Sequence, residues 1–108
     1  MLHDLARCNA ATDVGDNPRA AVYCGATAEG LAMLAASISR SELWASIRLN
    51  EVLNLKRAAN AHFSDDRPRA EQQYRSALAI VEDLCIDYAT PERRANAKFL
   101  RKILAAHF

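Results

Sequence analysis

RAEQQYRSALAIVEDLCIDY, residues 69–88, is the stretch whose pattern decides the fold class. Its apolar residues recur at steps of three and four, the spacing that places side chains on one side of a helix. This stripe consists of Ala70, Tyr74, Ala77, Leu78, Val81, Leu84, Cys85 and Tyr88. An apolar stripe has to be buried, so the chain must supply partner helices.

Similar patterns precede this segment. Residues 2–11 mix apolar and charged side chains and predict a short amphipathic helix, which the turn-forming residues around Gly15 would end. Asn17 before Pro18 is typical of a helix start, with Asn17 as the N-cap. From there apolar residues, most of them small, recur at helical spacing: Ala21, Cys24, Ala28, Leu31, Ala35 and Ile38.

Gly25 and Gly30 lie inside that predicted helix, where each costs about 1 kcal/mol relative to alanine. We expect these glycines to allow the backbone of a neighbouring helix to approach closely. A glycine that contacts a ligand is the alternative.

The next predicted helix runs from Ser39 to Phe63. Ser39 and Glu42 match the capping box, in which a serine and a glutamate three residues later satisfy the first amide groups of a helix. Ile38 and Leu43 take the positions of a hydrophobic staple.

Two further starts combine a capping residue with a proline. Asp66 precedes Pro68 at the start of the helix quoted above, and Thr90 precedes Pro91 at the start of the last one. In the last helix we expect Ala95, Phe99, Leu100, Ile103 and Leu104 to face inward. Its outward residues are expected to be Arg93, Arg94, Lys98, Arg101 and Lys102.

No stretch shows the alternating pattern or the β-branched residues of a strand. The sequence therefore predicts an all-α protein, a small antiparallel helical bundle of four main helices plus a short N-terminal helix. A chain of 108 residues fits one domain, residues 1–108.

Composition narrows the function classes. The formal net charge is +1, so the chain as a whole does not resemble a nucleic-acid or anionic-membrane binder. The basic residues are concentrated near one end, because residues 91–108 carry five basic and one acidic side chain. No apolar run approaches the roughly 20 residues of a membrane span, and no secretory signal is recognisable.

Three cysteines, Cys8, Cys24 and Cys85, stand apart without a C-x-x-C spacing. The odd count argues against a disulfide framework or zinc site and predicts a cytoplasmic protein. Cys24 and Cys85 lie on apolar stripes and are expected to be core residues, whereas Cys8 is expected to be partly exposed. His3 and His107 share no metal-ligand spacing, so neither a metal nor another cofactor is predicted.

Residues from about 54 to 90 resemble a single tetratricopeptide repeat (TPR), a hairpin of two helices. Ala70, Tyr74 and the pair Ala77-Leu78 match the small, aromatic and Ala-Leu positions of its second helix. The tryptophan and Leu-Gly positions of the first helix are not matched, and residues 17–50 hold no second copy. The resemblance implies a TPR-like hairpin within a small bundle, with an adaptor or chaperone-like role in holding a peptide or partner helix.

His62 is the most suggestive single residue for an activity. It precedes Ser64, Asp65 and Asp66, and a histidine on an exposed helix could accept a phosphoryl group in a phosphotransfer bundle. The simpler interpretation is a histidine at a helix C-terminus, where a partial positive charge is favourable. No second catalytic group is placed beside it by spacing, so no enzyme is predicted.

Two features suggest a binding surface. Arg94, Lys98 and Arg101 line one ridge of the last helix, where they could meet phosphates or an acidic partner, or could be simply solvated. Trp44, the single tryptophan, could anchor a partner if it lies at an edge, although core packing is the default.

These observations lead to a functional hypothesis. We expect a non-enzymatic module for protein–protein interaction or self-association, an adaptor or scaffold without membrane association. A nucleic-acid-binding or regulatory protein that uses the basic last helix is one alternative, and a phosphotransfer bundle that uses His62 is another.

Overall fold

The computed structural model describes residues 2–108, and every regular element in that range is an α-helix. The helices are α1 Leu2–Asp13, α2 Asn17–Ala36, α3 Glu42–His62, α4 Arg67–Asp87 and α5 Pro91–His107. The all-α prediction and its division into a short first helix and four longer ones are therefore confirmed. No helix in residues 2–108 has both the length and the apolar character needed to cross a membrane.

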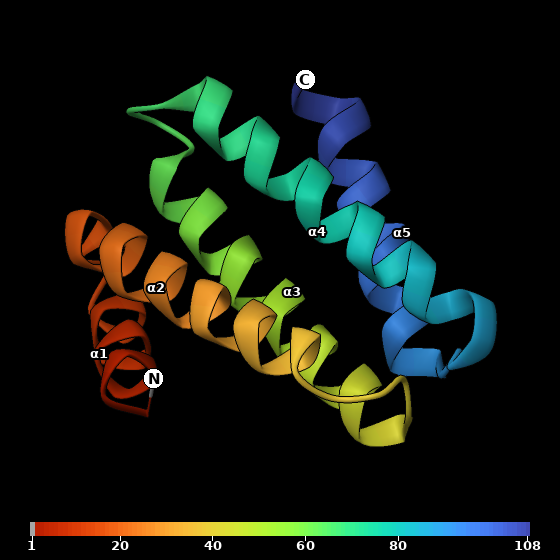
Figure 1. Ribbon diagram of the computed structural model, residues 1–108. Helices are drawn as coiled ribbons and strands as arrows, with labels where there is room; N and C mark the ends of the chain where they lie inside the picture. Colours follow the sequence, from red (N-terminus) through yellow and green to blue (C-terminus); the bar gives the residue numbers. More distant parts are fainter. Residues whose placement is uncertain (1) are drawn as a thin grey trace.

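Each helix packs mainly against its neighbour in the chain. Figure 1 shows α3 between α2 and α4, with these three helices alternating in direction, while α5 passes behind α4 and α1 lies beside α2. Both α3 and α5 pack extensively against α4 but hardly against each other.

Two of the predicted helix starts are confirmed. The Asp66 side chain accepts a hydrogen bond from the backbone amide of Arg69 (3.3 Å), and the Thr90 hydroxyl accepts one from the amide of Arg93 (3.1 Å). Each bond satisfies one of the first amide groups of a helix, which have no partner within the helix itself.

The other two predicted starts are wrong in position. The N-cap of α2 is Asp16 rather than Asn17, because the Asp16 carboxylate accepts the hydrogen bond from the start of the helix. The N-cap of α3 is Ser41 rather than Ser39, since the Ser41 hydroxyl accepts from the backbone amide of Trp44 (3.1 Å). The expected staple does not bury its second residue, because Leu43 is 65% exposed.

The largest buried cluster joins α3, α4 and α5, and the stripe of residues 70–88 supplies much of it. Five members of that stripe are buried and the other three are half-buried, as expected. Tyr74 is the largest fully buried side chain, and its hydroxyl donates to Asn60 Oδ1. Burial also raises the pKa of Tyr74.

The orientation of α5 differs from the prediction at three positions. Arg93 is buried, whereas Ala95 and Phe99 are exposed. Arg93 turns inward because its guanidinium donates to the Tyr88 carbonyl (2.7 Å) and to the Glu42 carboxylate (2.6 Å). These bonds offset the cost of removing its charge from water.

The expectation for Gly25 is also wrong. A Cβ atom built at Gly25 would have no heavy atom within 4 Å beyond its own helix backbone and chain neighbours, so no neighbouring helix needs the glycine there. We therefore expect Gly25→Ala to raise the free energy of unfolding by about 0.5–1 kcal/mol, because alanine is the better helix former. Urea unfolding followed by circular dichroism measures this change.

Gly15→Ala is the matched control. Gly15 has a φ of +72°, a conformation that costs an alanine side chain energy, so this variant should be less stable than the parent. A Gly25→Ala variant that is also destabilised would contradict the open space around Gly25.

Candidate functional site

A disulfide joins the two N-terminal helices. Cys8 of α1 and Cys24 of α2 are bonded and fully buried, and Cys85 is the free cysteine. This corrects the prediction that none of the cysteines is paired and that Cys8 is partly exposed. The positions of the two cysteines could have indicated this pairing. Cys8 and Cys24 lie at similar distances on either side of the turn at Gly15, so they face each other across a helical hairpin.

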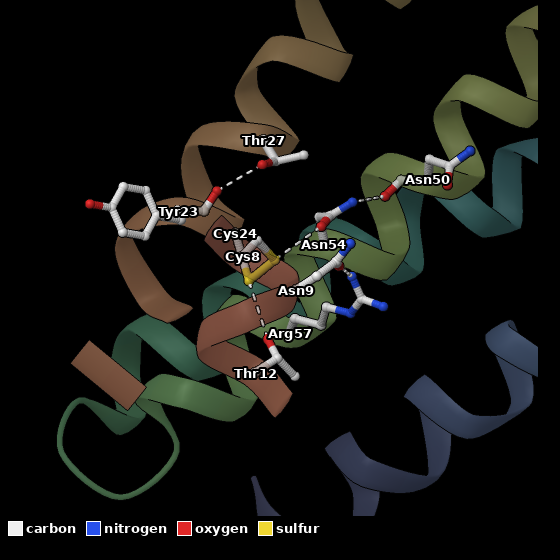
Figure 2. Close-up of a disulfide and its surroundings, with 9 residues drawn as sticks. All are labelled: Cys8, Asn9, Thr12, Tyr23, Cys24, Thr27, Asn50, Asn54 and Arg57. Atoms are coloured by element: carbon white, nitrogen blue, oxygen red, sulfur yellow. Dashed lines mark hydrogen bonds between the residues drawn. A yellow bond between two sulfur atoms is a disulfide. The ribbon is translucent and has the colours of Figure 1, made fainter. Parts of the chain in front are cut away.

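The side chains around this disulfide are small or polar (Figure 2). Asn54 of α3 places its Oδ1 3.3 Å from Cys8 Sγ, while its Nδ2 donates to the Asn50 carbonyl (2.8 Å). The Thr12 hydroxyl lies 3.7 Å from Cys24 Sγ. The other buried members of the cluster are all alanines: Ala11, Ala20, Ala58 and Ala61.

A groove of about 540 Å³ lies between α3 and the first turn of α5. The α3 side presents Ser46, Leu49, Asn50 and Leu53, which occupy successive turns of one helix face. The α5 side is residues 90–93, which include the buried Arg93. Apolar side chains thus meet a polar rim, and Arg93 is fixed in place by its bonds to Glu42 and to the Tyr88 carbonyl.

Two cations continue the same face of α3 beyond Leu53. Lys56 and Arg57 are both half-buried, and the Lys56 ammonium lies 5.0 Å from the centroid of the Phe99 ring of α5. Burial lowers the pKa of Lys56, and the nearby charge of Arg57 lowers it further. Arg57 Nη1 donates to Asn9 Oδ1 of α1 (2.7 Å). Sequence reasoning had not singled out either cation.

A second hollow lies between α2 and α4. Glu51 of α3 lies at its base, buried and ion-paired with Arg48. Burial raises the pKa of Glu51, and the attraction of Arg48 opposes that rise without cancelling it.

This pKa shift predicts an acid-dependent difference between the parent and Glu51→Gln. A carboxyl group whose pKa is raised by folding contributes stability that is fully present below its unfolded pKa and is lost as pH rises through the folded pKa. We therefore expect the parent to gain stability relative to Glu51→Gln as pH falls from about 7 toward the ordinary value of 4.5. Urea unfolding of both proteins across this range measures the difference. The opposite slope would mean that the attraction of Arg48 outweighs burial.

His62 ends α3, as the helix C-terminus interpretation expected. Its side chain is 18% exposed and lines a further hollow between α2 and α4, separate from the one at Glu51, with Nδ1 3.7 Å from Asp65 Oδ1. That separation is too long for a direct hydrogen bond. Residues 3–108 hold no cluster of three or more histidine, cysteine or acidic side chains suited to a metal ion.

The predicted partner-binding residues lie apart from the groove lining. Trp44 is buried against Tyr88, with the Arg40 guanidinium 4.2 Å above its ring, which fits its core interpretation. Arg94 and Lys98 are exposed on α5. Arg101, the third residue of the predicted ridge, pairs with Glu82 of α4 (3.0 Å).

The sequence matches none of the protein-family models compared with it, and no curated protein or solved structure matched either. The TPR resemblance of residues 54–90 stays a prediction.

Proposed function

We propose that the chain is a non-enzymatic protein-interaction module, of adaptor or chaperone-like type, that binds a segment of a protein partner in the groove between α3 and α5. The observation that carries this proposal is the groove itself. Its volume of about 540 Å³ falls within the range of ligand-binding pockets. The half-buried Leu53 and the edge of Leu49, which is 8% exposed, provide apolar contact area, and the surrounding serine, asparagine and threonine side chains provide hydrogen-bonding groups.

The shape of the groove suits a peptide segment. Its α3 face extends from Ser46 to Leu53, a rise of about 10 Å at about 1.5 Å per residue. An extended chain covers that length with about three residues. Both walls are helices, which hold side chains more firmly than loops do and limit the ordering cost of binding.

A nucleic-acid-binding role has some support from the exposed cations Arg94 and Lys98 on α5. The ion pair between Arg101 and Glu82 reduces the charge of that ridge. The phosphotransfer alternative has less support, because most of the His62 side chain is buried. The disulfide favours an oxidising compartment over the expected cytoplasmic location, because disulfides persist mainly in oxidising compartments.

The proposal can be tested by phage display, in which random 12-residue peptides are selected for binding to the immobilised protein. We expect enriched peptides that shift the backbone amide resonances of residues 46–57 and 90–99 in the NMR spectrum. Ser46→Trp should abolish binding, because it fills the groove from an exposed position without disturbing the core. Met33→Trp, at an exposed position of α2, is the matched control and should bind normally.

A lack of enriched peptides would count against the proposal. So would peptides that bind the Ser46→Trp and Met33→Trp variants equally well, because their binding site would then lie outside the groove.

A further inference from the structure

Lys56 and Arg57 differ from every other basic residue of the chain. Four of the lysine and arginine side chains are not exposed, namely Arg48, Lys56, Arg57 and Arg93. Arg48 is paired with Glu51, and Arg93 is paired with Glu42. Within residues 2–108, neither Lys56 nor Arg57 has a carboxylate at ion-pair distance. Lys56 and Arg57 are therefore adjacent, half-buried cations, one beside Phe99 of α5 and the other bonded to Asn9 of α1, with no paired carboxylate in the described residues.

A bound anion would stabilise these two cations. Burial removes water from the Lys56 ammonium, and the charge of Arg57 repels it, as the lowered pKa of Lys56 reflects. The Phe99 ring offers Lys56 an attraction weaker than a charge pair. A carboxylate between the two cations would gain charge-assisted hydrogen bonds at a partly desolvated site.

The two side chains are also positioned for such a ligand. Asn9 of α1 holds one Nη atom of Arg57, which leaves the other donors of the guanidinium free to meet a planar carboxylate. Leu49, Leu53 and Lys56 lie at steps of four and three residues, so they share one face of α3. The cations thus lie next to the apolar part of the groove.

We propose that the groove binds an acidic peptide segment, with a carboxylate seated between Lys56 and Arg57 and an apolar side chain against Leu49 and Leu53. This inference rests on the proposed function and names the chemistry of the partner. Glu92 at the opposite end of the groove would repel a second carboxylate there, which sets the direction of the segment. The apolar lining favours a peptide over a nucleic acid, whose backbone presents phosphates without aliphatic side chains.

The amino-acid composition of the peptides enriched in the phage selection tests this inference. We expect the enriched peptides to carry an aspartate or glutamate close to an apolar residue. Lys56→Gln/Arg57→Gln should bind such a peptide at least about tenfold more weakly in a titration at low salt. Arg94→Gln/Lys98→Gln removes the same charge from the exposed side of α5 and should leave the affinity within about twofold.

The outcomes separate the two proposals. Enriched peptides that lack acidic residues and bind Lys56→Gln/Arg57→Gln normally would overturn the carboxylate assignment while leaving the groove function intact. A lack of enriched peptides would overturn both. A single-stranded 20-nucleotide DNA that displaces the peptides and itself requires Lys56 and Arg57 would overturn the assignment to an acidic peptide.

Discussion

Replacing Cys8 and Cys24 together by alanine is expected to lower the free energy of unfolding by about 3 kcal/mol. The bond joins residues separated by 16 positions, and a cross-link of that length removes much of the conformational freedom of the unfolded chain. The apolar contacts around the bond cannot replace it, because the buried partners of the two cysteines are alanines with little surface to bury. We expect α1 to separate from α2 before the rest of the bundle unfolds.

Guanidinium chloride unfolding and amide hydrogen exchange measure these two effects. Cys85→Ala is the matched control, since it removes a half-buried free thiol and no cross-link. Reduction of the disulfide by a dithiol should lower the free energy of unfolding by less than the double substitution does. The reason is that a reduced Cys8 thiol can donate a hydrogen bond to Asn54 Oδ1. Fast exchange of α1 amides in the oxidised parent would contradict this account.

Leu84→Ala is expected to destabilise the protein by about 2–5 kcal/mol. Leu84 is fully buried in the cluster that α4 shares with the end of α2 and the start of α3, where it meets Ala35, Trp44 and Leu49. Truncation removes its apolar contacts and leaves a cavity that a rigid tryptophan and small alanines cannot fill. Thermal and urea unfolding give the size of the loss.

Ile86→Ala provides the comparison within the same helix. Ile86 lies two residues further along α4 and is 75% exposed, so its truncation should change stability by less than about 0.5 kcal/mol. Similar losses for Leu84→Ala and Ile86→Ala would contradict the orientation of α4.

Helical periodicity predicted the orientation of α4 because the apolar residues of that helix are regularly spaced and leave the other side of the helix polar. Capping residues located α4 and α5 for a similar local reason, since each cap acts within three residues of itself. The same rule misplaced two helix starts where two capping residues lie within two positions of each other. Asp16 competes with Asn17, and Ser41 competes with Ser39.

Tertiary contacts account for the other differences. The inward position of Arg93 depends on Glu42 and on the Tyr88 carbonyl, and no local pattern indicates that these groups meet. The groove depends on the angle between α4 and α5. No local sequence pattern indicates that angle. Lys56 and Arg57 match ordinary polar positions of an amphipathic helix in the sequence, and only contacts with other helices, Phe99 for Lys56 and Asn9 for Arg57, distinguish them.

The packing of each helix against its neighbour in the chain has a consequence for how the protein folds. Contacts between consecutive helices close short loops, and proteins dominated by such contacts fold on the microsecond to millisecond scale. The main cluster of α3, α4 and α5 can therefore assemble from adjacent segments without waiting for the N-terminal helices. Oxidation of Cys8 and Cys24 to the disulfide takes seconds or longer, so the disulfide would form in a bundle whose helices are already packed.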